Sequence, residues 1–311
     1  MSRHHLRFAQ LDVFTSTPFL GNPLAIVHLP NGTLLSQDDK QLVAREFNLS
    51  ETVFLHQHNS ASDAPVVIEI FTPNEELPFA GHPTVGTSFY LLSLAPERDT
   101  ITLQTRAGLI PVVRAAGGTK VRLQAPIDFM VHQRLTIPSI KTLQPHLTDA
   151  DFVNGATGGE ACASVVKGMT FLLLEISSED ALRRMQPYPT RLSIPDAAKA
   201  ALGEWAQGFT GMYAFYRETR ASTDSKTTLR TRAFDGPVED PATGSAACTL
   251  CGWLALQNGS AGLHEFNILQ GVEMGRRSEI TVVVDVGTDQ KIKSIALEGA
   301  AVEVMEGTVT I

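Results

Sequence analysis

Charge and cysteine are scarce in this sequence, and long apolar runs are missing. Charged residues make up 19% of the 311 positions, the formal net charge is −8, and no run of basic residues occurs. Binding to nucleic acid or to an anionic membrane is therefore not expected. Three cysteines in a chain of this length do not predict a disulfide framework. Apolar runs such as Met169–Leu174 are too short to span a bilayer, and no signal peptide is apparent, so a cytoplasmic protein is expected.

Signatures of nucleotide, flavin and metal binding are also missing. No Gly-x-Gly-x-x-Gly follows a predicted strand, and neither a phosphate-loop lysine motif nor a Gly-x-Ser-x-Gly elbow occurs. Cys248 and Cys251 lie three apart without a second pair, which predicts buried apolar fillers and not a zinc site. His56 and His58 share one strand face without a third ligand. The sequence therefore predicts no cofactor and no metal, and it leaves acid–base chemistry on a small anion.

Two stretches of the sequence follow one pattern. FTPNEELPFAGHPTVGTSFYLL (71–92) and VEDPATGSAACTLCGWLAL (238–256) each run from acid and proline through glycine into an apolar helix. Setting Gly81 on Gly244 places His82 on Ser245. A weaker similarity sets residues 46–54 on 208–216, with Glu51 on Tyr213, at an offset of 162. A repeat of this length predicts a duplicated domain and not a solenoid.

Strand patterns dominate the rest of the sequence, with one long buried helix in each half. The stretch 125–140 has two prolines and no clear period, which predicts a linker near residue 127. The predicted fold class is α+β, with two pseudo-symmetric domains at 1–126 and 127–311. Each would be a curled, mainly antiparallel sheet around a central helix, and the last strand could pack on the N-terminal domain. A cleft between the domains would bring both helix starts face to face.

Four polar residues are candidates for the chemistry. Glu51 begins a predicted strand, where a solvated carboxylate is the simpler interpretation; in an apolar cleft it would suit a general base. His82 lies at a helix start, where the dipole favours neutral imidazole, although a structural histidine is equally consistent. Asp240 and Ser245 lead into the second helix, where an acid that stabilises the dipole and an N-cap are the simpler interpretations.

Five segments together carry a family resemblance. They are QLDVFTSTPFLGNPLAIV (10–27), FNLSETVFL (47–55), FTPNEELPFAGHPTVGT (71–87), EDPATGSA (239–246) and QGVEMGRRSEI (270–280). In this order they resemble the PhzF-like family, whose members are relatives of diaminopimelate epimerase. The resemblance implies the diaminopimelate-epimerase-like fold of two pseudo-symmetric domains, usually in homodimers, with no cofactor.

The resemblance also implies roles for individual residues. It makes Glu51 the catalytic residue that moves a proton between two substrate carbons. Three further catalytic positions and four substrate-binding positions follow from it: His82, Asp240 and Ser245, and then Gly81, Gly244, Thr243 and Ala246. In the epimerase relatives two cysteines act from the paired helix starts. Here histidine and serine stand there, so a two-thiol racemase is not expected.

Three departures from the family pattern concern the substrate more than the fold. The segment 234–239 is short, Arg277 stands where proline is usual, and residues 130–166 match poorly. The expected function is a cofactor-independent isomerase, PhzF-like, that moves a proton within a small conjugated carboxylic acid. An amino-acid epimerase with Glu51 and Asp240 as its two bases, and a non-enzymatic binding protein that retains the fold, are the alternatives.

Overall fold

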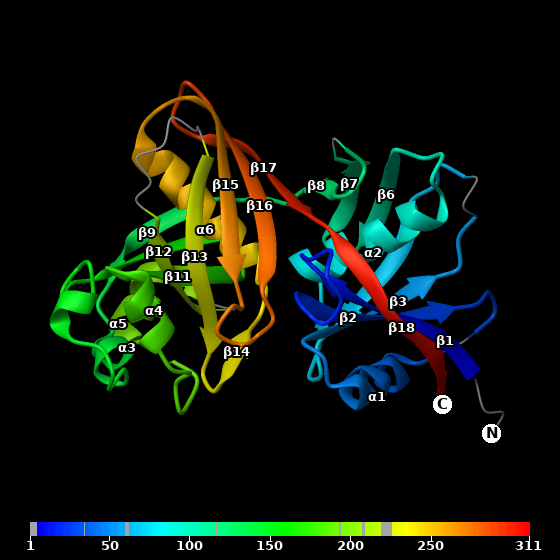
Figure 1. Cartoon of the computed structure of the whole chain (residues 1–311), viewed down its shortest axis with the longest axis horizontal. Helices are drawn as coiled ribbons and strands as arrows, with labels where there is room; N and C mark the ends of the chain where they lie inside the picture. Colours follow the sequence, from blue (N-terminus) through cyan, green and yellow to red (C-terminus); the bar gives the residue numbers. More distant parts are fainter. Residues whose placement is uncertain are drawn as a thin grey trace. The chain divides into compact units, whose positions relative to one another are not determined.

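The computed structural model describes residues 5–33, 35–59, 62–115, 117–192, 194–206, 209–218 and 226–311. They divide into two units, which are described separately (Figure 1). Unit 1 comprises Met1–Ala125 and Leu297–Ile311, and unit 2 comprises Pro126–Ala296. Unit 1 is therefore discontinuous in sequence, because the final strand returns to it.

Unit 1 contains two helices and nine strands among its described residues. They are β1 (His5–Val13), β2 (Asn22–Leu29), α1 (Gln37–Phe47), β3 (Glu51–His56), β4 (Val66–Phe71), β5 (Glu76–Leu77), α2 (Gly81–Leu94), β6 (Thr100–Thr105), β7 (Gly108–Arg114), β8 (Val121–Gln124) and β18 (Ala301–Thr310). The strand β17 (Ile292–Gly299) crosses the boundary between the units.

Unit 2 is built on the same plan, with additional short helices. Its elements are β9 (Met130–Leu135), α3 (Pro138–Thr142), η1 (Asp149–Asp151), β10 (Glu160–Val166), β11 (Met169–Glu175), α4 (Glu179–Arg184), α5 (Asp196–Leu202), η2 (Gly203–Ala206), β12 (Phe209–Arg217), β13 (Lys226–Asp235), β14 (Val238–Asp240), α6 (Gly244–Asn258), β15 (Gly262–Gln270) and β16 (Ser278–Val286). None of the described helices is long and apolar enough to cross a membrane.

The helix α2 is the centre of unit 1 (Figure 1). It packs against β1, β2, β3, β6, β8 and β18, and most of its side chains are buried on every side. Gly86 permits this contact, because an added Cβ would lie 2.6 Å from Leu24 Cδ2. Fully buried side chains such as Val85 and Leu92 each contribute about 1.5–3 kcal/mol to stability. The helix ends at Leu94, two residues before a proline that disfavours its continuation.

The helix α6 has the corresponding place in unit 2. It packs against β10, β11, β15 and β16, and twelve of its residues from Gly244 to Ala255 are buried. Gly252 lies against the Phe129 ring, where a larger residue would collide. The helix ends at Asn258 and its C-cap, Gly259, has a φ of +71°, which favours glycine. The predicted buried helix in each half is therefore confirmed.

Strand pairing repeats from one unit to the other. In unit 1, β2 pairs parallel with β3, β3 antiparallel with β4, β4 antiparallel with β5 and parallel with β6, and β6 antiparallel with β7. In unit 2, β11, β12, β13, β14, β15 and β16 repeat these directions in the same order. Each central helix follows the short hairpin strand, β5 or β14. The sheets are mixed and mainly antiparallel, which confirms the predicted fold class.

These ladders also give the residue-by-residue match. Ile70 pairs with Leu77 in the first hairpin, and Ala233 pairs with Asp240 in the second. Leu77 and Asp240 stand at the same distance before their helix starts, at Gly81 and Gly244. Ile70 and Ala233 are therefore equivalent positions.

The weaker of the two sequence matches is wrong by two residues. On the neighbouring strands, Ile70 pairs with Val53 and Ala233 with Tyr213. Tyr213 therefore matches Val53, at an offset of 160, and not Glu51. Glu51 matches Gly211 instead. A shift of two residues leaves the inward and outward alternation of a strand unchanged, so the apolar pattern could not reveal it.

The region predicted to be a linker holds a strand. Residues 130–135 form β9, which pairs with β10, and β10 was not predicted either. The strand β9 is largely exposed and carries polar residues, so its apolar alternation is weak. The strand β10 is buried along nearly its whole length, so it has no alternation to detect. Tertiary pairing therefore decides both strands.

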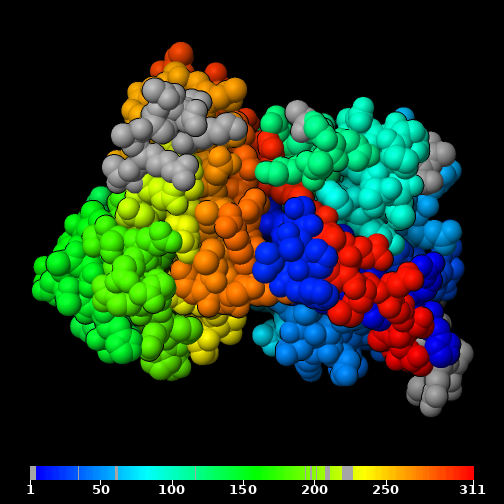
Figure 2. All heavy atoms as spheres, in the orientation of Figure 1, coloured from blue at the N-terminus to red at the C-terminus, as the bar shows by residue number. Residues whose placement is uncertain are grey.

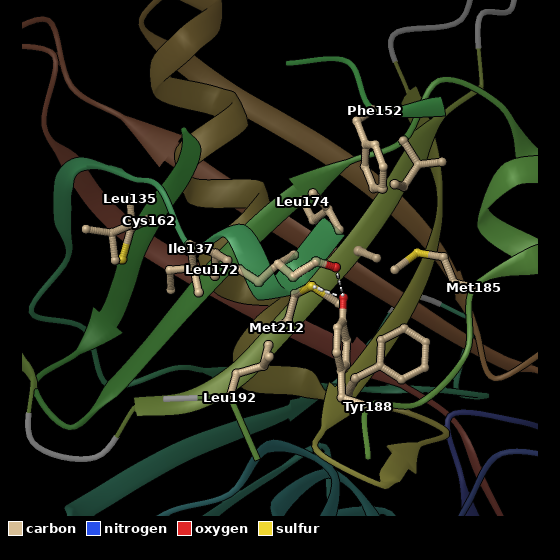
Figure 3. Packing of buried hydrophobic residues seen from close by; sticks show 14 of the residues in the cluster. Leu135, Ile137, Phe152, Cys162, Leu172, Leu174, Met185, Tyr188, Leu192 and Met212 are labelled. Carbon is tan, nitrogen blue, oxygen red and sulfur yellow. Dashed lines mark hydrogen bonds between the residues drawn. The ribbon is translucent and has the colours of Figure 1, made fainter. Parts of the chain in front are cut away.

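A second core in unit 2 lies around Tyr188 (Figure 3). The hydroxyl of this fully buried residue donates to the Ile140 carbonyl oxygen at 2.9 Å, among apolar residues that include Leu174 and Met212. In unit 1 the C-terminal strand β18 lies at the surface along β1 (Figure 2). His5 pairs with Thr310 there, and Val13 with Ala301.

Candidate active site

Both central helices begin without a side-chain cap. The N-cap residues are Ala80 for α2 and Thr243 for α6, and neither makes a capping hydrogen bond. By contrast, Ser36 caps α1 and forms a capping box with Asp39. Backbone N–H groups in the first turn carry partial positive charge and need acceptors, so an uncapped helix start suits an anionic ligand.

Glu51 and His82 meet in unit 1. Glu51 is the first residue of β3 and His82 is the second residue of α2. Glu51 Oε2 lies 3.4 Å from His82 Nδ1, and the two side chains are 17% and 4% exposed. A carboxylate and an imidazole are thus held together at an uncapped helix start, largely shielded from water.

The imidazole of His82 is neutral at physiological pH. Burial lowers its pKa from 6.5 to about 3, although a hydrogen bond with the Pro23 backbone acts in the opposite direction. The short approach to Glu51 is therefore not an ion pair. His82 Nε2 is buried and has no hydrogen-bond partner within the described residues. A buried polar atom without a partner costs free energy, and a ligand atom could satisfy it.

Asn22 joins this cluster and was missed from the sequence. Its Nδ2 lies 3.5 Å from His82 Nδ1, and its Oδ1 accepts a hydrogen bond from Ser50 Oγ at 3.1 Å. Asn22 thereby connects the His82 ring to the Ser50 hydroxyl. Gly21, just before it, has a φ of +70° and would bring any Cβ onto the Val13 carbonyl. The available signal is the Gly-Asn-Pro sequence, which by itself indicates no more than a turn between strands.

In unit 2 the candidate residues gather at the start of α6. Asp240 is the last residue of β14, and its Oδ2 accepts a hydrogen bond from Thr243 Oγ1 at 2.5 Å. Ser245 is the second residue of α6, the position that His82 has in α2, and is 9% exposed. Gly244 and Ala246 flank it and are buried. The hydroxyl of Thr243, predicted from the resemblance to bind substrate, here contacts Asp240.

Gln270 is a second residue that sequence reasoning missed. It lies at the end of β15 and is fully buried. Its Nε2 donates to the Asp240 carbonyl oxygen at 2.7 Å and to Thr243 Oγ1 at 3.0 Å. The segment that contains it was matched to the family without a role, because nothing local links it to a helix start that lies earlier in the chain.

The cysteines of α6 are not part of this chemistry. Cys248 and Cys251 are buried and free. Burial raises the pKa of the Cys248 thiol to about 12 and raises that of Cys251 well above its usual value. Both remain protonated thiols inside the helix packing, which confirms that they are apolar fillers.

The structure thus forms two polar clusters, one in each unit. The first holds Glu51, His82 and Asn22 at the start of α2, and the second holds Asp240, Thr243, Ser245 and Gln270 at the start of α6. The sequence pattern of the family described as "Phenazine biosynthesis-like protein" matches residues 11–307. The chain belongs to this family. The resemblance of the five segments is therefore confirmed.

Relatives of this family match along almost the whole chain. A trans-2,3-dihydro-3-hydroxyanthranilate isomerase of Pseudomonas aeruginosa is 31% identical over 306 residues, covering 97% of this chain and 98% of the relative. An uncharacterized isomerase of Pasteurella multocida is 37% identical over 279 residues, covering 88% of this chain and 86% of the relative. The names of both proteins agree with the predicted enzyme class.

Solved structures show the same fold. A phenazine biosynthesis protein of the PhzF family from Bacillus anthracis has a TM-score of 0.75 at 23% identity, covering 99% of this chain and 100% of that one. A hydroxyproline epimerase of Agrobacterium vitis has a TM-score of 0.60 at 13% identity, covering 99% and 93%. At these identities the two structures support the epimerase-like fold alone.

Proposed function

We propose that this protein is a cofactor-independent isomerase that moves a proton within a small conjugated carboxylic acid. The observation that carries the proposal is the contact between Glu51 Oε2 and the buried, neutral His82 at 3.4 Å. A partly buried carboxylate beside an uncharged imidazole is suited to take a proton and give it back. The isomerases among the relatives support the same reaction class.

Glu51 acts in both steps of the proposed reaction. As a carboxylate it removes a proton from an activated C–H bond, and the electron pair of that bond delocalises into the conjugated system. The resulting carboxylic acid returns the proton to another carbon, so that Glu51 ends ionised and the atoms of the substrate are unchanged. His82 stays neutral throughout, and its unpartnered Nε2 is available to a polar atom of the substrate.

Both uncapped helix starts take part in the proposal. The substrate carboxylate and the developing negative charge would be stabilised by first-turn N–H groups, which are already oriented before the reaction. We propose that the two clusters serve one substrate, with Asp240 and Ser245 orienting it. The two clusters hold different polar groups, which supports this proposal. The Glu51–His82 pair is in unit 1, and the Asp240 cluster is in unit 2.

The test uses the substrate named for a relative, trans-2,3-dihydro-3-hydroxyanthranilate, in D₂O. Proton NMR would follow substrate loss and the position of incorporated deuterium for wild type, Glu51→Gln and Glu97→Gln. Glu97 is an exposed carboxylate and serves as the matched control. Glu51→Gln should lower the rate by about 10²–10⁴-fold, because it removes the base but keeps the shape. Glu97→Gln should leave the rate unchanged.

Two other results would redirect the proposal. Full activity in Glu51→Gln would reject Glu51 as the base. Deuterium at the α-carbon of amino acids tested in parallel, without isomerisation of the conjugated acid, would identify an epimerase. If wild type acts on neither, other conjugated carboxylic acids are screened, and their failure would reject the isomerase.

A further inference from the structure

Gln270 makes four hydrogen bonds that leave its amide one orientation. Two donors converge on Oε1, the Tyr213 hydroxyl at 2.8 Å and the Thr243 backbone N–H at 3.2 Å. Two acceptors lie by Nε2, the Asp240 carbonyl at 2.7 Å and Thr243 Oγ1 at 3.0 Å. A flipped amide would set donor against donor and acceptor against acceptor. The oxygen therefore faces Tyr213, and the nitrogen faces Asp240 and Thr243.

The Tyr213 hydroxyl reinforces this orientation of the Gln270 amide. Tyr213 is fully buried on β12, and burial raises the pKa of its phenol well above the usual value. It therefore stays protonated and remains a donor. Its hydroxyl also lies 2.9 Å from Thr231 Oγ1, and a single phenol proton cannot go to both oxygens. Gln270 and Thr231 therefore share one phenol donor. The Thr243 backbone N–H and the Asp240 carbonyl, whose roles as donor and acceptor cannot change, still fix the Gln270 amide.

The direction of the Thr243 hydroxyl follows from the amide. Because Thr243 Oγ1 accepts the Gln270 N–H, its own proton points elsewhere, and Asp240 Oδ2 lies 2.5 Å away. An ionised carboxylate can accept but not donate, so Thr243 is the donor. Such a charge-assisted bond is short and strong, and it favours the ionised form of the acid.

We propose that Gln270, oriented by Tyr213, is a positioning residue that makes the Thr243 hydroxyl donate to Asp240. Asp240 is thereby kept an ionised, fixed carboxylate that orients the substrate and is a poor proton acceptor. This inference rests on the proposed function, and it assigns the proton transfer to Glu51 alone. It also opposes a two-base epimerase, because that reaction needs one of its two groups protonated to deliver a proton to the opposite face, and a carboxylate kept ionised has none to give.

The first test needs no substrate. Carbon NMR of protein labelled at the aspartate carboxyl carbons would follow Asp240, whose signal is assigned by its loss in Asp240→Asn. Thr243→Val and Gln270→Met remove the donors at nearly constant shape. Each should move the titration midpoint of Asp240 to higher pH, by roughly one unit for Thr243→Val. Tyr213→Phe, which removes one oxygen, should cause a smaller shift in the same direction.

Matched controls come from the same unit. Thr281 makes a side-chain hydrogen bond with Asn267, and Gln144 makes two with the Gln186 backbone. Thr281→Val and Gln144→Met should leave the Asp240 midpoint unchanged. An Asp240 midpoint that stays constant in Thr243→Val, Gln270→Met and Tyr213→Phe would overturn the inference.

The second test separates this inference from the proposed function. If the wild type is active, the acidic limb of its kcat/KM profile against pH should move to higher pH in Gln270→Met. The titration midpoint of Glu51 should stay where it is in the wild type. An inactive wild type would count against the proposed function, and the NMR titration would still decide the role of Gln270. An unmoved acidic limb, together with an unmoved NMR midpoint, would show that Gln270 supports the fold alone.

Discussion

The two units repeat one arrangement of strands around a central helix, but they place polar residues at different points of it. Along the matched strands the residues around Asp240 correspond to a mostly apolar set in unit 1. Tyr213 matches Val53, Thr231 matches Ile68, Asp240 matches Leu77, Thr243 matches Ala80 and Gln270 matches Thr105. Conversely, the position in unit 2 that is equivalent to the polar Glu51 of unit 1 is Gly211. The duplicated fold supplies two helix starts, and a different set of polar residues lies at each of them.

Gly211 gives a structural reason why unit 2 has no carboxylate equivalent to Glu51. Its φ is +127°, a conformation that side chains other than glycine's rarely adopt. An added Cβ would lie 2.6 Å from the Phe234 carbonyl oxygen, and that backbone is fixed in the sheet. A carboxylate equivalent to Glu51 therefore cannot be accommodated in unit 2 without moving a strand.

Among the tests of the difference between the two units, the largest effect on stability is expected from a substitution of His82. The unfolded state binds a proton below about pH 6.5, while the folded state does so near pH 3. Stability is therefore lost as the pH falls, by about 1.4 kcal/mol per unit, or roughly 3 kcal/mol between pH 7 and 4.5. His82→Asn should remove this dependence in urea unfolding followed by circular dichroism. The exposed His146→Asn is the control, and an unchanged slope in His82→Asn would contradict the assignment of a neutral imidazole.

A smaller effect is expected from Gly211→Ala. The methyl group meets a backbone carbonyl at a positive φ, so unit 2 should lose about 1–3 kcal/mol of stability. Both tryptophans, Trp205 and Trp253, lie in unit 2, so their fluorescence reports its unfolding. Gly275→Ala, at a φ of +69° with no atom near the added carbon, measures the conformational cost alone. Equal losses in both variants would remove the steric reason for the asymmetry.

The smallest effect is expected from Ser245→Ala. This change removes a hydroxyl at the position equivalent to His82 but leaves the backbone N–H groups of the helix start in place. The loss of one hydrogen bond to substrate, worth about 0.5–1.5 kcal/mol, should raise KM by roughly 2–10-fold and leave the turnover rate nearly unchanged. Steady-state kinetics measures the two separately. A turnover rate lowered by about two orders of magnitude would instead make Ser245 a participant in proton transfer.

Much of this arrangement could be predicted from local sequence. The two apolar helices are recognisable because they are apolar on every side and follow proline and glycine. The catalytic roles predicted for Glu51 and His82 came from the resemblance, and the structure brings their side chains within 3.4 Å of each other. Reasoning from the residues alone favoured a solvated carboxylate, because nothing near Glu51 in sequence indicates that α2 lies beside it.

The polar network of unit 2 could not be predicted in this way. Tyr213, Asp240 and Gln270 come from three strands and meet through sheet pairing and one turn. Each residue alone is compatible with many environments. The predicted register also matched Tyr213 with Glu51 of unit 1 instead of Val53. The direction of each hydrogen bond depends on all members of the network together, so it can be assigned once the side chains are placed.

The return of β18 to β1 has a consequence for how the chain folds during synthesis. The two strands pair from His5 with Thr310 to Val13 with Ala301, so the whole of unit 2 leaves the ribosome before β1 receives this neighbour. Until then one edge of the N-terminal sheet lacks its native partner and is open to intermolecular strand pairing. Joining the end of β18 to the start of β1 by a short peptide and opening the chain elsewhere would give a circular permutant in which β18 precedes β1, and this edge would be paired early.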